Sequence, residues 1–222
     1  MSEDLYRRAL SALQGRVSKE TLAALEHSLE QLAPAWTDVT VLCVDLRGFR
    51  TARRHFKDAE QVFAALNAHY FGPVISILVE QGGCIDRIID DQVHAVFGAP
   101  RRLEAHVSAE QAVRAAQLIQ SRLADLPLQL QQSLEVGVKG VACGLASGKA
   151  LSGLVGQRPF CSWTLLGELT TLAGAIEDAA AEGQVLADAS TLDVLGQTPP
   201  PDVEQRVVVV GRAHPADVYV LS

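Results

Sequence analysis

The stretch from Gly82 to Pro100, GGCIDRIIDDQVHAVFGAP, contains two short apolar runs separated by a pair of acids. Strand-forming residues lie on both sides of Asp90 and Asp91, which predicts a β-hairpin with two carboxylates at its tip. Aspartate is a common turn residue, but two like charges side by side also suit a metal site. The rest of the sequence has to distinguish these interpretations.

A second apolar run, VTVLCVDL at residues 39–46, is rich in β-branched residues and has one acid, Asp45, near its end. A continuous apolar run of this length is typical of a strand that is buried on both faces of a sheet. The run therefore predicts a central strand that ends at a carboxylate.

The order of the remaining segments predicts the fold class. Helical spacing of apolar residues predicts a helix over 59–81, in which Pro73 can cause a kink, and another over 108–126. Strand, helix, two strands, helix and strand in this order indicate a ferredoxin-like α+β core with a C-terminal extension. The later elements are expected as a strand, Gly-rich turn and strand within 134–156, a strand over 161–168, a helix over 169–182, a strand over 184–188 and two strands about a Gly-Arg turn within 206–222.

Residues 1–37 are predicted to form a helical segment that precedes a domain of residues 38–222. Ser18 is a suitable helix cap and Pro34 ends the helical pattern. Such an amphipathic helix can pack on its own domain or pair with another chain. Its apolar stripe consists of Leu22, Leu25, Leu29 and Leu32.

Composition limits the function classes. The 222 residues are 48% hydrophobic and 20% charged, which is enough for one sizeable core. The net charge of −7 disfavours nucleic-acid binding, because phosphate contacts need clustered Lys and Arg. Four scattered cysteines without a CxxC pair, no apolar signal core and no run near the roughly 20 residues of a membrane span predict a cytoplasmic protein.

Five blocks in order resemble the class III adenylate/guanylate cyclase catalytic domain. They are VTVLCVDLRGF, GGCIDRIIDDQVHAVFGAP, GLASGKALSGLVG, WTLLGELTTLAGAIE and GRAHPADVYVL, and together they extend from about Asp38 to Leu221. The resemblance implies the class III cyclase fold and an intramolecular reaction. In that reaction the ribose 3′-hydroxyl of a nucleoside triphosphate attacks the α-phosphate, and pyrophosphate leaves.

The resemblance also implies a two-ion Mg²⁺ or Mn²⁺ site, because two divalent ions assist this chemistry. The metal carboxylates of the family fall on Asp45 and Asp91, and its phosphate-binding turn falls on the backbone of Leu46, Gly48 and Phe49. Asp90 stands where the family usually has Gly, and we interpret it as a turn residue. This half of the site resembles an intact one.

The other half, which the second subunit supplies in this family, departs from the pattern. The ribose-orienting Asn falls on Thr171 and the phosphate-stabilising Arg falls on Ala175. The base-reading Lys and Asp fall on Arg87 and Ser162, and Arg is no simple substitute for Lys in a fitted pocket. Arg212 matches a position that contacts the terminal phosphates in some members.

Three functions remain open from the sequence. The first is a weak or unusual nucleotidyl cyclase that acts as a homodimer. The second is a non-catalytic module that binds a nucleotide or a protein partner. The third is one half of a heterodimer, in which this chain supplies Asp45 and Asp91 and a cyclase-like partner supplies Asn and Arg. His94 and His106 lack ligand spacing and are interpreted as structural.

Overall fold

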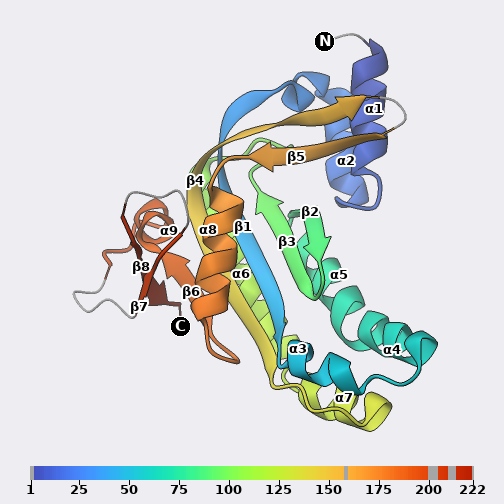
Figure 1. Ribbon diagram of the computed structural model, residues 1–222. Helices are drawn as coiled ribbons and strands as arrows, with labels where there is room; N and C mark the ends of the chain where they lie inside the picture. The colour runs from blue at the N-terminus through green and yellow to red at the C-terminus, as the bar shows by residue number, and fades with distance from the viewer. Residues whose placement is uncertain (1–2, 158–159, 200–204, 210–213, 222) are drawn as a thin grey trace.

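A mixed sheet runs through the centre of the molecule, with helices on both faces (Figure 1). The computed structural model describes residues 3–157, 160–199, 205–209 and 214–221. The strand order is β2-β3-β1-β4-β6-β8-β7, and β5 pairs with β4 beside this path. The strands are β1 (Ala35–Arg47), β2 (Cys84–Ile89), β3 (Gln92–Phe97), β4 (Gly140–Gln157), β5 (Phe160–Leu166), β6 (Val185–Asp188), β7 (Gln205–Val207) and β8 (Ala216–Val220).

The sheet separates two apolar cores. On one face, alternate residues of β1 pack against the helices that lie between β1 and β4 in the chain. On the other face, the remaining β1 side chains pack against α8 and the N-terminal helices. The helices are α1 (Glu3–Leu13), α2 (Lys19–His27), α3 (Phe49–Ala52), α4 (Ala59–Leu66), α5 (Gly72–Glu80), α6 (Ala105–Arg122), α7 (Leu126–Leu134), α8 (Leu169–Ala179) and α9 (Ala189–Val194), with single turns η1 (Leu29–Leu32), η2 (Arg53–His55) and η3 (Asn67–Phe71).

The predicted α+β core is confirmed. β1 is antiparallel to both β3 and β4, and every residue from Val39 to Leu46 is buried. β2 and β3 form the predicted hairpin, with Ile89 opposite Gln92, so that Asp90 and Asp91 make its two-residue turn. Successive β1 side chains enter different cores on the two faces of the sheet, which explains why its sequence is apolar over 39–46.

The helix predicted over 59–81 is present as one helical run, Ala59–Glu80. Within it, α4 leads through a π-helical turn, η3, into α5, and Pro73 lies in the first turn of α5, just after η3. The run Ala59–Glu80 is long and apolar enough to cross a membrane by composition. The expectation that no run approaches that length was therefore too strong, although the inward face of this run lies in the core.

The strand, turn and strand predicted within 134–156 were wrong. Residues up to Leu134 belong to α7, and β4 is one continuous strand through all of its glycines. Gly144 is required because a Cβ there would collide with the backbone of Ala173 and Glu177 in α8. The glycines thus permit close packing where the sequence pattern had indicated a turn. The helices α7 and α9 were not predicted.

The N-terminal residues form two helices and a 3₁₀ turn, folded against the arm formed by β5 and the far end of β4 (Figure 1). The predicted cap is confirmed, since Ser18 Oγ accepts a hydrogen bond from the Thr21 N–H at 3.1 Å. Leu25 and Leu32 are fully buried in the same core as Trp163. Most of the apolar stripe therefore packs within the chain.

Candidate active site

Two buried carboxylates meet where β1 reaches the tip of the β2–β3 hairpin. Val44 pairs with Val93, so the next residue of β1, Asp45, lies beside the turn that carries Asp91. Asp45 is 8% exposed and Asp91 is 4% exposed. The structure thus brings together the two acids that the sequence assigned to a metal site.

The two acids interact strongly. Burial, followed by the charge of Asp45 and a hydrogen bond with it, raises the pKa of Asp91 to about 7. Arg47 Nη1 lies 3.0 Å from Asp45 Oδ2 and partly balances that carboxylate. Asp91 therefore ionises near neutral pH, well above the usual range of an aspartate.

The donor set fits a magnesium-type ion. Within the described ranges, no three His, Cys, Asp or Glu residues cluster in a way that could enclose a metal. Mg²⁺ is commonly held by one or two carboxylates and completes its shell with water and substrate phosphate. Two adjacent buried carboxylates, one with a pKa raised by burial and by the charge of the other, match that requirement.

The turn after Asp45 has the backbone that the predicted phosphate site needs. Gly48 has φ +90°, and an added Cβ would contact the backbone of Val138 and Lys139 at 3.4 Å. Leu46 is the penultimate residue of β1, and the buried ring of Phe49 lies against Phe56 with centroids 5.7 Å apart. The turn is held beside the acids, while its phosphate-binding role stays a prediction.

Two contacts that the sequence did not indicate fix the hairpin tip. The buried Tyr70 hydroxyl, from the π-helical turn, donates to Asp91 O at 2.6 Å and to Val44 O at 3.3 Å. Asp90 has φ +56°, as a turn residue requires, and its Oδ2 lies 2.6 Å from Arg53 Nη1. The strain at Asp90 and the ion pair together suit a positioning role rather than a third metal ligand.

Three other predicted residues line one pocket of about 370 Å³ next to the acids. Arg87 comes from β2, and Thr171 and Ala175 come from α8. Ser162 is absent from this lining, and its hydroxyl accepts from Arg16 Nη1 at 3.1 Å. Arg212 lies outside the described residues. The rest of the lining is Ile89, Gln92, His94, Thr170, Gly174, Asp178, Val208 and Val209.

A buried contact between Arg47 and Glu177 connects the acids to this pocket. Arg47 Nη2 lies 2.7 Å from Glu177 Oε1, and Arg47 Nε donates to Ala180 O at 3.1 Å. Glu177 is fully buried near the end of α8, and burial and the charge of Asp45 raise its pKa to about 8. Gln92 Nε2 also donates to Glu177 Oε2 at 2.9 Å. The signal that could have found this pair is a Glu on the buried face of an apolar helix.

The two histidines differ in environment. His94 is buried in the pocket wall, with Nε2 3.5 Å from Cys43 Sγ, and burial followed by the charge of Arg87 lowers its pKa. His106 is exposed on α6. A neutral, packed His94 agrees with the structural role expected from the sequence.

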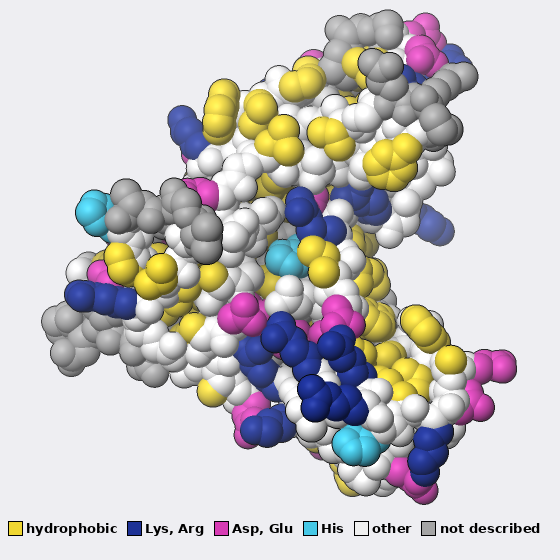
Figure 2. Space-filling view, viewed as in Figure 1, with side chains coloured by type: hydrophobic (Ala, Val, Ile, Leu, Met, Phe, Trp, Pro, Cys, Tyr) yellow, Lys and Arg dark blue, Asp and Glu magenta, His cyan; other side chains and the backbone are white. Residues whose placement is uncertain are grey.

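Basic side chains gather over the segment that follows the Gly48 turn, in the lower half of the face shown in Figure 2. The exposed ones are Arg50, Arg53, Arg54 and Lys57. In a chain of net charge −7, these residues give a local positive field beside the turn that follows Asp45. The sequence analysis did not identify it.

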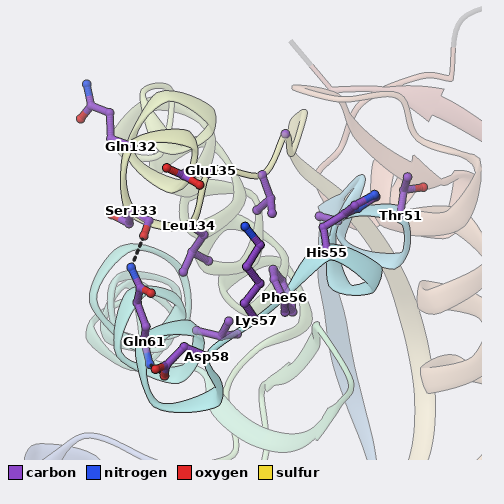
Figure 3. A pocket seen from close by; sticks show the side chains of 14 residues that line it. Thr51, His55, Phe56, Lys57, Asp58, Gln61, Gln132, Ser133, Leu134 and Glu135 are labelled. Atoms are coloured by element: carbon purple, nitrogen blue, oxygen red, sulfur yellow. Dashed lines mark hydrogen bonds between the residues drawn. The ribbon is translucent and has the colours of Figure 1, made fainter.

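A larger hollow of about 670 Å³ lies between the η2–α4 segment and α7 (Figure 3). Gln61 Nε2 donates to Ser133 O at 2.8 Å and ties its two walls together. The lining includes His55, Lys57 and Glu135 but none of the predicted site residues.

Relatives among curated proteins resemble this chain over most of its length. A Mycobacterium tuberculosis protein described as uncharacterized is 29% identical over 195 residues, which are 86% of this chain and 34% of that protein. A second one from the same organism is 27% identical over 194 residues, with the same coverage of this chain. The chain therefore spans about a third of the length of the curated relatives it matches.

Solved structures share the fold. The adenylyl cyclase CyaB from P. aeruginosa superposes with a TM-score of 0.76 at 24% identity, over 86% of this chain and 97% of that one. The guanylate cyclase domain of RhGC from Catenaria anguillulae, solved in complex with GTP, has a TM-score of 0.67 at 20% identity, over 84% and 96%. The family described as the adenylate and guanylate cyclase catalytic domain matches residues 32–222. This chain is a member of the adenylate and guanylate cyclase catalytic-domain family.

Proposed function

We propose that this chain is a nucleotidyl cyclase-like protein of cyclic-nucleotide signalling that binds a metal–nucleoside triphosphate but turns it over slowly, or not at all, when alone. One observation carries the proposal. Asp45 and Asp91 meet in a buried pair, in which burial and the charge of Asp45 raise the pKa of Asp91, while Thr171 and Ala175 offer no strong donor to a phosphate.

The residues divide into those that support binding and those that limit turnover. Members of this family use divalent metal ions, which would neutralise the triphosphate and activate the 3′-hydroxyl. Asp45 and Asp91 would hold the ions, with Asp45 oriented by Arg47 at 3.0 Å. Ala175 has no donor and Thr171 is short, and losing one preorganised donor typically costs about 10²–10³ in rate.

The proposal includes a dimer, because the second set of residues acts on the partner's acids in this family. A homodimer would contain two complete metal sites, each facing a degraded pocket. A heterodimer with a cyclase-like chain that carries Asn and Arg would contain one complete site. The retention of both acids together with the loss of both donors favours the heterodimer as the active form.

The boundaries and location belong to the same proposal. We assign residues 38–222 to the cyclase homology domain and residues 1–37 to a helical segment that folds against it. The N-terminal helices share a core with Trp163 and Leu165, which supports treating the segment as part of the working unit. The site faces cytoplasmic nucleotides in this proposal.

Complementation tests the proposal. The wild type, the Thr171→Asn/Ala175→Arg variant and a mixture with a family member that lacks the acids but keeps Asn and Arg would be assayed with ATP, GTP, CTP and UTP in Mn²⁺. We expect no or slow product from the wild type alone and clear product from the mixture. The double variant should gain activity, though by less than two independent donors would give, because both act on one phosphate.

Asp45→Asn is the matched control, since it should abolish product in the mixture and in the double variant. Rapid cyclisation by the wild-type chain alone would contradict the proposed loss of function at Thr171 and Ala175. An inactive double variant that still folds and binds Mn²⁺ would favour a binding module without turnover.

A further inference from the structure

Arg16, from the link between α1 and α2, joins two strands that do not pair with each other. Its guanidinium donates to β2 through Nε to Ile85 O at 2.6 Å and Nη2 to Asp86 O at 2.7 Å. It donates to β5 through Nη1, to Trp163 O at 2.9 Å and Ser162 Oγ at 3.1 Å. Four hydrogen bonds from one side chain that is 19% exposed make this an anchored contact.

Asp86 connects Arg16 to the pocket. Its side chain is completely buried at a bulge in β2. Its Oδ1 lies 3.8 Å from Arg16 Nη2 and accepts from Thr164 Oγ1 at 2.8 Å, and its Oδ2 accepts from Arg87 Nε at 2.5 Å. A buried carboxylate of this kind needs both cations, because an unpaired charge in the interior is costly.

Arg87 is consequently held in one orientation, and some of its guanidinium N–H groups remain available to a ligand. Its Nη2 donates to Thr164 Oγ1 at 3.2 Å, and its Nη1 has no hydrogen-bond partner in the part of the chain that the structure describes. The side chain is 40% exposed and lines the pocket that also contains Thr171. The pocket therefore receives a planar guanidinium edge, which donates hydrogen bonds and accepts none.

Ser162, which stands where the resemblance implies an acid, lies outside the pocket lining, and its hydroxyl accepts from Arg16 and donates to Trp163 O at 3.4 Å. The carboxylate in the lining is Asp178, on α8. Against Arg87, an adenine ring would direct its 6-amino group, a donor, toward N–H donors. Guanine presents O6 and N7, two acceptors that a guanidinium binds in bidentate fashion.

We propose that Arg16 is a positioning residue that fixes Arg87 through Asp86, and that this makes the pocket select guanine nucleotides over adenine nucleotides. The inference rests on the proposed nucleotide-binding function and adds the identity of the base. It gives the N-terminal segment a direct part in substrate choice.

Binding of non-cyclisable 3′-deoxynucleoside triphosphates in Mg²⁺, measured by calorimetry, tests this without turnover. The guanine nucleotide should bind about tenfold more tightly than the adenine nucleotide. The hypoxanthine nucleotide, which keeps O6 and N7 but lacks the 2-amino group, should bind like the guanine one. If the 2-amino group decided the preference instead, Asp178 rather than Arg87 would be the reader, and the inference would be wrong.

Variants separate positioning from a structural role. Arg87→Lys and Arg16→Gln should both reduce the guanine-to-adenine ratio toward one. Arg7→Gln is the matched control in α1, because Arg7 is exposed and pairs with Glu3 at 2.7 Å on the surface, and the ratio should not change. Thr164→Val removes one acceptor of Arg87 without touching the N-terminal segment, and should lower the ratio even if Arg16→Gln does not fold.

The outcomes distinguish a failure of the proposed nucleotide-binding function from a failure of the base assignment. No binding of any of the three nucleotides would contradict the proposed function itself. Binding with equal or better affinity for adenine in the wild type would overturn the base assignment alone. A folded Arg16→Gln variant with an unchanged ratio would overturn the role of Arg16.

Discussion

Asp45 lies between an acid, Asp91, and a base, Arg47. It raises the pKa of Asp91 on one side and receives Arg47 Nη1 at 3.0 Å on the other. Arg47 continues to Glu177, so one side chain serves both the acid pair and α8. A change at Asp45 should therefore show in stability and in ion binding separately.

We predict opposite effects of Asp45→Asn with and without divalent ions. In EDTA at pH 8, the variant should melt at the same or a higher temperature than the wild type, because the repulsion with Asp91 is gone. Addition of Mg²⁺ with a nucleoside triphosphate should raise the melting temperature of the wild type only. Thermal melts with Asp193→Asn as a remote control check this, and an Asp45→Asn variant that responds like the wild type would show that the acids do not bind ions.

The metal-free chain should lose stability as the pH rises from 6.5 to 9. The pKa values of Asp91 and Glu177 are raised to about 7 and 8, so the folded state holds protons that the unfolded state has released. A group with a raised folded pKa stabilises at low pH, and that contribution disappears as the pH passes the folded value. His94, whose pKa is lowered, destabilises only on the acid side of this window.

Melting temperatures in EDTA across this range measure the effect. Asp45→Asn should flatten the curve, because the charge of Asp45 raises both pKa values. A wild-type melting temperature that rises steadily from pH 6.5 to 9 would contradict the protonated state of the pair.

At the scale of elements, α8 depends on its close approach to β4. A Cβ at Gly144 would meet the α8 backbone, so the position of Thr171, Ala175 and Glu177 depends on a residue without a side chain. Gly144 is therefore as much a part of the site as the residues that line it.

We predict that Gly144→Ala destabilises the fold by about 1–3 kcal/mol or more, since overpacking moves backbone. Gly137→Ala is the matched control, because a Cβ there would meet only Gln131 Oε1 at 4.0 Å and φ is not in the left-handed region. Urea unfolding of the two variants measures the difference, and equal stabilities would show that α8 shifts at little cost.

Local patterns predicted the elements that local chemistry determines. The hairpin, β1 and the Ser18 cap follow from residues close in sequence, and all three are confirmed. The continuity of β4 could not be predicted, because its glycines are needed for close packing against segments far away in the chain, such as α8 beside Gly144. The acid pair was predicted through a resemblance, whereas Arg47 and Glu177, 130 residues apart, meet only in the folded chain.

At the scale of the molecule, the arm formed by β5 and the end of β4 presents an apolar row. Trp36 of β1 pairs with Leu151 of β4, which pairs with Leu166 of β5, so the three side chains lie in line across the sheet. Trp36 is 71% exposed and Leu166 is 52% exposed. Figure 2 shows hydrophobic side chains along this upper arm.

We predict a homodimer at micromolar concentration in which this row is buried. Leu166→Glu should weaken the dimer strongly, because a charge in an apolar interface loses its hydration. Leu128→Lys, at a 60% exposed residue on α7, is the control and should leave the dimer intact. Sedimentation velocity checks both, and a monomeric wild type at that concentration would contradict the prediction.

The length of β4 connects the arm to the candidate metal site. Eighteen residues in one strand extend about 60 Å. One end pairs with β5, and the other begins next to Lys139, whose N–H donates to Arg47 O at 2.8 Å beside the Gly48 turn. A ribbon paired along 13 positions with β1 resists shear, so a displacement of the arm has to reach the Gly48 turn beside Asp45. Association and ion binding are then reciprocal, and Mg²⁺ should tighten self-association by the same factor by which self-association tightens Mg²⁺.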